Sequence, residues 1–255
     1  MTVTMSREGA LAVVTLNRPD KLNAINREMR GALRSVFDEI SVDDRIKVAI
    51  VGGAGAKAFS AGWDLSEETA MKPFDRRREV SWAPGNVIRA CTKPVIAMIR
   101  GYALGGGAEV AAACDIRLGS ESAVVGFPEI EHGWVPAGGG GTQLLPRIVG
   151  MGAAMTLVLT GRRIDATEAF RIGFLDAVVS DGELEDRARA LAEEISAHRL
   201  RALVLAKAAL RISERVSLDV GLEYEKEIAA IADHFEDKAS AVSAFDAGRR
   251  VQFDY

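Results

Sequence analysis

Short β-branched apolar runs that alternate with helical patterns constrain the fold of this chain more than any other feature. Leu11–Leu16 (LAVVTL) is such a run, and the turn Asn17–Asp20 ends it. The run is typical of a buried strand. Apolar residues then recur at helical spacing over Asn26–Ser41, where Asn23 or Asn26 is the expected N-cap. Further runs predict strands over Lys47–Val51, Pro94–Ile99, Asp115–Leu118, Val124–Gly126 and Ala177–Val179.

Helical periodicity dominates the chain after Asp165. It predicts helices over Glu183–Ala197, Leu200–Glu214, Leu218–Phe235 and Ala239–Arg250. Because strands and helices alternate first and helices run last, we expect an α/β core with a helical C-terminal part. Ser66–Gly85 has weak periodicity, which predicts either a mobile, partly helical flap or a surface insertion without a role.

Composition excludes several classes of function. The 255-residue chain has a net charge of −4 and 48% hydrophobic residues, so we expect a packed globule without a broad nucleic-acid surface. Cys91 and Cys114 have no metal or redox spacing, which predicts reduced thiols, no metal site and a cytoplasmic location. Met1–Arg7 lacks the apolar run of a signal peptide, and no stretch approaches the roughly 20 apolar residues that span a bilayer. Neither nucleic acid nor a membrane is an expected partner.

A glycine-rich turn opens an apolar helix after the third of the longer runs. Gly105–Gly107 let the backbone approach a ligand closely, and the free N–H groups of the helix N-terminus suit a developing anion. No P-loop or dinucleotide pattern is present. Glu109 follows in the first turn among Ala and Val residues. Burial would favour its neutral form and the helix dipole its charged form, and the alternative is a solvated helix-terminal glutamate.

Two further stretches carry candidate chemistry. Lys57–Leu65 has Gly62 before Asp64, which describes a turn that aims an N–H group at a ligand, or an ordinary strand-to-helix turn. Glu129 follows a proline and lies between apolar residues, whereas Glu131 is expected to be a surface charge. The lone histidines are weaker candidates, because a single histidine is more often structural: His132, His198 and His234.

These stretches together resemble the enoyl-CoA hydratase/isomerase family, also called the crotonase family, over the whole chain. Five ordered segments carry the resemblance: Asn17–Ala24, Phe59–Asp64, Gly101–Glu109, Pro128–Glu129 with Gly139–Gln143, and Leu159–Gly173. The string Ala61–Leu65 (AGWDL) is also similar to that of carnitinyl-CoA dehydratases.

The resemblance implies a fold and an assembly. It implies an α/β spiral of ββα turns with a C-terminal helical region that builds homotrimers, often paired as hexamers. We therefore expect a catalytic core over residues 1–198, and a helical region over residues 199–255 that trimerises and covers the acyl pocket.

The resemblance also assigns site residues. It gives the oxyanion hole to the backbone N–H groups of Trp63 and Gly106, and the acid and base positions to Glu109 and Glu129. It implies a coenzyme A channel lined by Lys21, Leu22, Ala24, Ala61, Asp64 and Leu65. The expected acyl pocket contains Trp63, Trp82, Trp134 and Pro136. No cofactor is implied beyond the coenzyme A of the substrate.

Paired glutamates favour addition of water to a trans-2-enoyl thioester, with two N–H donors holding the negative charge on the carbonyl oxygen. The alternatives are a Δ-isomerase, a carnitinyl-CoA dehydratase-like lyase acting on a charged acyl group, and an RNA-binding relative. Trp63 is bulky where many relatives have Ala or Gly. Gly248-Arg249 replaces a more typical Lys-Arg pair, so Arg249 or Arg250 is the expected substitute at the coenzyme A phosphates.

Overall fold

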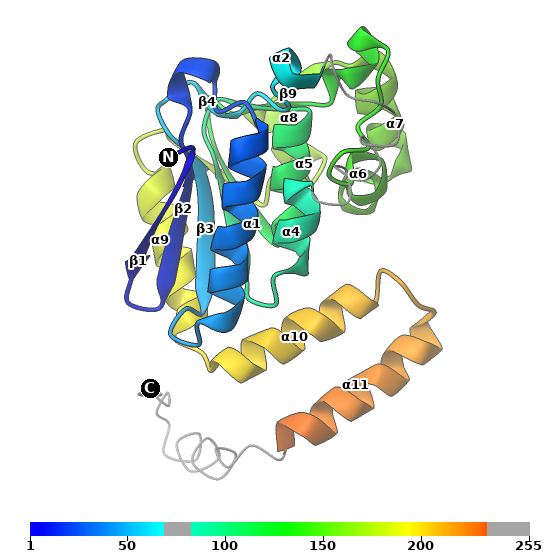
Figure 1. Ribbon diagram of the computed structural model, residues 1–255. Coiled ribbons are helices and arrows are strands. Elements are labelled where there is room, and N and C mark those ends of the chain that lie inside the picture. The colour runs from blue at the N-terminus through cyan, green and yellow to red at the C-terminus, as the bar shows by residue number, and fades with distance from the viewer. Residues whose placement is uncertain (69–82, 234–255) are drawn as a thin grey trace.

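The computed structural model describes residues 1–68 and 83–233, and two sheets organise this part of the chain (Figure 1). The large sheet has the order β1-β2-β3-β5-β7-β10, parallel except for the β1–β2 pair. Its strands are β1 (Val3–Glu8), β2 (Leu11–Leu16), β3 (Val48–Gly53), β5 (Val95–Ile99), β7 (Ile116–Ser120) and β10 (Ala177–Val179). The small sheet contains β4 (Ala58–Ser60), β6 (Tyr102–Leu104), β8 (Val124–Gly126) and β9 (Arg163–Asp165), in that order.

Each turn of the chain gives one strand to each sheet. The pairs β3–β4, β5–β6 and β7–β8 follow one another, and their strands are parallel neighbours in both sheets. Helices connect successive turns: α2 (Leu65–Glu68) and α4 (Pro84–Ala90) follow β4, and α5 (Gly106–Ala113) follows β6. This repeat is the spiral of ββα turns that the resemblance implied.

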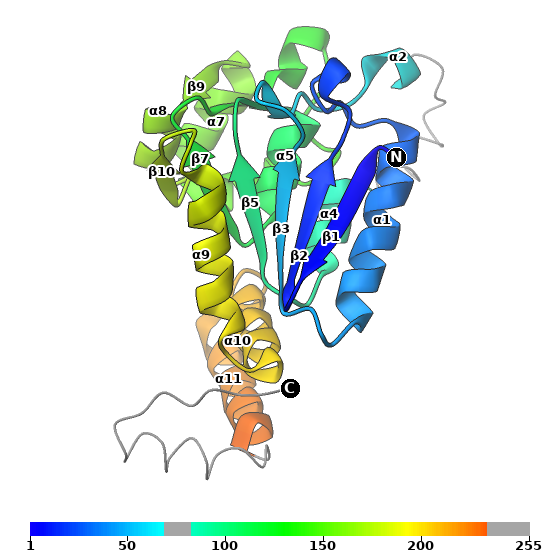
Figure 2. The same cartoon turned by 90° about the vertical axis from the view of Figure 1, so that its left-hand side faces the viewer.

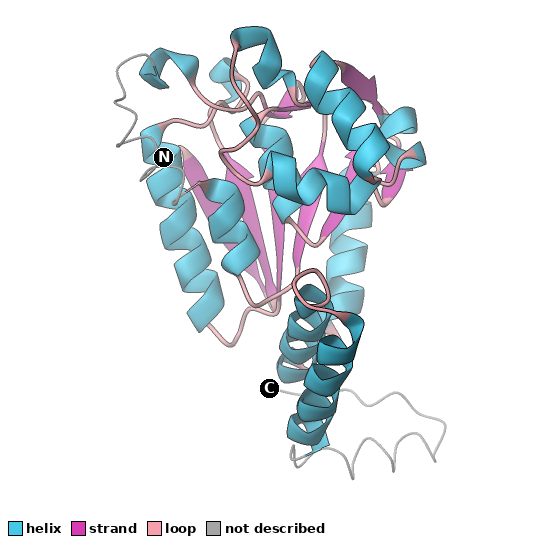
Figure 3. Cartoon of the chain, turned by 90° about the vertical axis from the view of Figure 1, so that its right-hand side faces the viewer, coloured by secondary structure: helices cyan, strands magenta, loops and turns pink. Residues whose placement is uncertain are grey.

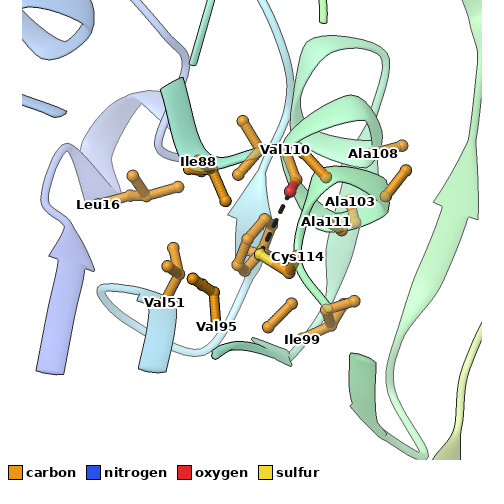
Figure 4. Packing of buried hydrophobic residues seen from close by; sticks show 14 of the residues in the cluster. Leu16, Val51, Ile88, Val95, Ile99, Ala103, Ala108, Val110, Ala111 and Cys114 are labelled. Atoms are coloured by element: carbon orange, nitrogen blue, oxygen red, sulfur yellow. Dashed lines mark hydrogen bonds between the residues drawn. The ribbon is translucent and has the colours of Figure 1, made fainter. Parts of the chain in front are cut away.

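The large sheet is packed on both faces. Helix α1 (Arg27–Val42), α4 and α5 cover one face, and α9 (Leu184–Ser196) covers the other (Figures 1 and 2). Successive strand residues alternate between two apolar clusters: Ala49 and Val51 pack toward α1, whereas Val48 and Ile50 pack toward α9. Burial on both faces explains why the strands are uninterrupted apolar runs. Figure 4 shows the first cluster around Val95 and Cys114.

The last two described helices form a separate antiparallel hairpin. Helices α10 (Leu200–Ile212) and α11 (Leu218–Asp233) lie side by side at the end of the core opposite α2 (Figures 1 and 3). Asp115, just before β7, anchors α10 by accepting from Lys207 and Arg211 at 2.6 Å each. Neither helix contains a buried residue.

The longer elements agree with the sequence predictions. Strands β2, β8 and β10 match their predicted bounds, and the ends of the other predicted strands and helices that lie within the described residues shift by at most two residues. Asn26 is the N-cap that accepts from Met29 N at 2.9 Å. The polar strand β1 and the three-residue strands β4, β6 and β9 were not predicted. Nor were the helices that follow the glycine-rich segments: α6 (Gly141–Val149), α7 (Met151–Thr160) and α8 (Ala166–Arg171).

Two predicted segments lie partly or wholly outside the described residues. Of Ser66–Gly85, residues 66–68 belong to α2, and Ala83 to Gly85 are buried at the start of α4. The predicted helix Ala239–Arg250 lies outside, together with Arg249 and Arg250.

Candidate active site

The N-terminus of α5 is built from glycines because other atoms occupy the space of their side chains. Gly105 caps the helix at φ 51°, and a Cβ there would lie 3.0 Å from Oε1 of Glu129. A Cβ at Gly107 would lie 2.2 Å from the carbonyl oxygen of Ser60, so α5 packs directly against β4. Gly106 is the first residue of α5, and its N–H has no acceptor within the helix.

The turn after β4 brings a second backbone N–H to the same place. Ile25 N donates to Gly62 O at 2.7 Å and Asp64 N to Ile25 O at 3.0 Å, so the Trp63 N–H takes no part in this bridge. Gly62 has φ 93°, and a Cβ at this position would lie 3.1 Å from Gly106 N. The structure therefore brings together the two loops predicted to form the oxyanion hole.

Buried Asn23 fixes the geometry of the first loop. It has φ 54°, and its side chain donates to Ala54 O and Ala58 O at 3.0 and 2.8 Å. Its carbonyl accepts from Ser60 Oγ at 2.9 Å, which in turn accepts from Gly62 N. The sequence suggested Asn23 only as a possible helix cap. Apart from Arg18, whose N–H donates to Asn23 Oδ1, these partners lie more than 30 residues away, and local spacing does not reveal them.

Glu109 is buried inside α5, where every residue is buried. Its Oε1 accepts from Gly141 N at 2.9 Å. Burial raises the pKa of this carboxyl, and the backbone N–H groups of Gly138, Gly139 and Gly141 and the Trp63 indole oppose the shift. Its Oε2 is buried without a partner at hydrogen-bond geometry in the described part of the chain. The alternative of a solvated glutamate is thereby excluded.

Glu129 lies in the 3-10 helix η2 (Pro128–His132) and is 9% exposed. Among the described residues, neither of its carboxylate oxygens has a hydrogen-bond partner. Burial raises its pKa to about 7, and the nearby charge of Glu109 adds to the shift. Both oxygens are thus available to a ligand, and the carboxyl exchanges a proton near neutral pH.

The stretches predicted to bind coenzyme A also lie side by side. Ala61 N donates to Leu22 O at 2.9 Å, and Arg18 joins Ala24 O to the carboxylate of Asp64 at 2.6 and 2.8 Å. Lys21 and Leu65 are exposed beside these contacts. Arg18 was not predicted as a site residue, although its place in the Asn17–Ala24 motif was a signal for it.

The predicted acyl-pocket residues divide into three groups. The indole of Trp63 lies at the N-terminus of α5, because a Cβ at Gly106 would meet it at 2.8 Å. Pro136 is buried against Gly141. Trp134 is half-buried, and its backbone N–H donates to Glu129 O at 3.0 Å. Trp82 lies outside the described residues.

Other predicted groups have structural roles or none that is visible. Glu131 forms an exposed ion pair with Arg163, with two contacts at 2.9 and 3.0 Å, as expected of a surface charge. His132 is exposed beside Trp134. Within residues 1–68 and 83–233, no cluster of three or more His, Cys, Asp or Glu side chains is arranged to hold a metal, and no helix is long and apolar enough to cross a bilayer.

Comparison with known sequences decides the family. A sequence model described as enoyl-CoA hydratase/isomerase matches residues 6–254. The chain belongs to the enoyl-CoA hydratase/isomerase family. It is 39% identical over 254 residues to a short-chain-enoyl-CoA hydratase of Clostridium acetobutylicum, covering 98% of this chain and 96% of that protein. It is also 33% identical to a crotonyl-CoA hydratase of Syntrophomonas wolfei, and the match covers 98% of this chain and 97% of that protein.

Solved structures support the same assignment. The enoyl-CoA hydratase of Bacillus anthracis superposes with a TM-score of 0.94 at 35% identity, over 100% of this chain and 99% of that one. These findings confirm the family and the fold expected from the motifs. They also support hydratase chemistry as the type of reaction that this family member carries out.

Proposed function

We propose that this family member is an enoyl-CoA hydratase, a lyase that adds water reversibly to a short trans-2-enoyl-CoA. The observation that carries the proposal is the pair of buried glutamates at the N-terminus of α5, where Glu109 lies in the first turn and Glu129 contacts Gly105. Glu129 has a pKa of about 7, and the charge of Glu109 contributes to it, so the two carboxyl groups interact. Two coupled carboxyls, one ionised and one neutral, supply the base and the acid that hydration needs.

The surroundings of each carboxyl suggest its role. Glu109 accepts a backbone N–H, which favours its ionised form, whereas neither oxygen of Glu129 has a donor among the described residues. We therefore assign the base to Glu109 and the acid to Glu129. Glu109 takes a proton from water as the water oxygen bonds to the β-carbon, and Glu129 gives its proton to the α-carbon.

The N–H groups of Trp63 and Gly106 are the proposed oxyanion hole. As water attacks, the electron pair of the carbon–carbon double bond moves toward the thioester carbonyl, whose oxygen gains negative charge. Two N–H donors there stabilise that charge, and one such donor is worth about 3 kcal/mol in comparable sites. The α5 N-terminus adds a partial positive charge of the right sign.

Coenzyme A is proposed to bind along the paired loops that lead to this hole. Leu22 and Ala24 line one side and Ala61 and Asp64 the other, with Lys21 and Leu65 exposed at the edge. The joined loops present backbone groups and a cation to the nucleotide. Turnover needs no cofactor other than the coenzyme A of the substrate.

The helical region beyond residue 198 is proposed to mediate trimerisation, with a catalytic core over residues 1–198. Apolar side chains stand exposed on α10 and α11, with Leu210 73% and Leu218 76% accessible. The hairpin lies at the end of the core opposite α2 (Figure 1), and this helical region is also proposed to cover the acyl pocket. A trimer or a dimer of trimers would bury this surface.

The test is turnover of purified protein with crotonyl-CoA, followed as loss of the conjugated-thioester absorbance. We expect hydration that is reversed when 3-hydroxybutyryl-CoA is supplied instead. A panel of 3-enoyl-CoA substrates tests the isomerase alternative, and carnitinyl-CoA tests the charged acyl group. Turnover of 3-enoyl substrates alone, or no turnover with any acyl-CoA, would overturn the proposal.

A further inference from the structure

The indole of Trp63 is wedged between two glycine segments beside Glu109. A Cβ at Gly106 would lie 2.8 Å from the indole Nε1, and a Cβ at Gly138 would lie 2.7 Å from it. The next residue, Gly139, approaches Glu109 in the same way, since a Cβ there would lie 3.3 Å from Oε2. Gly106 and Glu109 are three positions apart on α5 and therefore share one side of the helix. The indole N–H and Oε2 thus meet at the same short stretch of backbone.

A buried cation holds the ring in this place. Arg30 of α1 is 8% exposed, and its Cζ lies 5.1 Å from the centroid of the Trp63 ring. An arginine over an indole face is attracted by the ring electrons. With glycine backbone at its edge and a guanidinium over its face, the indole has little freedom to turn away from Glu109.

One oxygen of the Glu109 carboxyl lacks a hydrogen-bond donor among the described groups around it. Glu129 is the titratable side chain that interacts with this carboxyl, the cation Arg30 stacks on the Trp63 ring, and the backbone N–H groups that act on the carboxyl belong to Gly138, Gly139 and Gly141. Oε1 accepts from Gly141 N, whereas Oε2 has no partner at hydrogen-bond geometry in the described chain. The Trp63 indole N–H lies against Gly138, the residue before the glycine that approaches this oxygen, and it opposes the rise in the pKa of the Glu109 carboxyl.

We propose that Trp63 is a positioning residue, whose indole N–H donates to Oε2 of Glu109 when that carboxyl is ionised. This role is separate from that of the Trp63 backbone N–H, which phenylalanine or histidine at this position keeps. It rests on the proposed function, in which Glu109 is the base. The side chain at this position then selects the ionised form of the base and fixes the direction in which its free lone pair faces the water.

Trp63→Phe tests the proposal, because phenylalanine keeps an aromatic ring between the glycines and removes the donor. A hydrogen bond to a charged group is worth about one pH unit in a titration. We expect the acid limb of the kcat–pH profile to move up by about one pH unit, while the basic limb, set by Glu129, stays in place. At a pH below the limb, kcat falls about tenfold and KM changes little.

Two further measurements make the result decisive. Trp63→His keeps a ring N–H, so its acid limb is expected to move up less than that of Trp63→Phe. This comparison separates loss of the donor from loss of bulk. Titration of the ¹³C-labelled glutamate carboxyls, with Glu109 assigned from Glu109→Gln, is expected to give a higher pKa for Glu109 in Trp63→Phe than in the parent protein.

The outcomes separate the two proposals. If the Trp63→Phe titration of Glu109 and its pH profile both match those of the parent, the indole only fills space and the inference is wrong. If His and Phe shift the profile equally, the ring size and not the donor is responsible. The carboxyl titration needs no substrate, so it still decides the role of Trp63 if the parent fails to hydrate enoyl-CoA.

Discussion

Glu129→Gln is expected to stabilise the folded protein at alkaline pH, although it removes the proposed catalytic acid. Burial raises the pKa of Glu129 from 4.5 to about 7. A carboxyl whose pKa is raised by folding does not lower the free energy of unfolding below about pH 4, where it is protonated in both the folded and the unfolded state. The cost grows as the unfolded chain ionises, and it is complete above about pH 7, where the folded protein must ionise too.

The size of the effect follows from the shift. At 1.36 kcal/mol for each pKa unit, the cost of ionising Glu129 in the folded protein approaches about 3 kcal/mol at pH 8 and is below about 1 kcal/mol at pH 5. Glutamine is the neutral isostere and avoids it. Since a side chain only 9% exposed is weakly screened, most of this gain should be measurable.

Denaturant unfolding of Glu129→Gln and of the parent, at pH 5 and pH 8, measures the difference. Glu131→Gln is the matched control two residues away, because this glutamate is exposed, and its ion pair with Arg163 lowers its pKa. We expect no stabilisation in the control. A gain in Glu129→Gln that is absent at pH 8, or equal at both pH values, would show that the folded protein does not resist ionisation of this carboxyl.

Three further predictions concern packing, specificity and assembly. Gly139→Ala places a Cβ 2.9 Å from the Cβ of Glu109, so kcat should fall by about 10²-fold. Gly152→Ala on α7 is the control, because a Cβ there would meet no atom within 4 Å and kcat should stay unchanged. Trp63→Ala should change the preference for acyl chain length more than the peak turnover, and an unchanged substrate ranking would argue against a pocket role. Light scattering at micromolar concentration should give the mass of a trimer or hexamer, and a monomeric mass would contradict the proposed role of α10 and α11.

The strands of the large sheet were predictable because two packed faces demand continuous apolar runs. Val48–Val51 and Val95–Ile99 have such runs. Helix α1 was predictable from its stripe of buried apolar residues and from its N-cap at Asn26. Strand β1 was missed because it lies at the sheet edge with mostly polar residues, and β4, β6 and β9 are too short to show a period.

The proposed catalytic residues were predictable from motifs, but the contacts that hold them in place were not. Glu109 and Glu129 stand among apolar residues, and the structure shows that both are buried. Arg30 occupies a core-facing position of α1, where a sequence pattern gives no sign that a cation will stack on Trp63. That contact joins residues 33 positions apart through a turn whose shape depends on Asn23, and it follows only from the folded chain.

The kinetics of Glu109→Gln, Glu129→Gln and the double variant test the central claim most directly. If the two carboxyls act as one acid–base unit, each single variant should lose about 10²–10⁴ in kcat, and the double variant should lose far less than the product of the two losses. Coenzyme A affinity should barely change in any of them. A severe loss in one single variant with a mild loss in the other, or strictly multiplicative losses, would contradict a shared hydration mechanism.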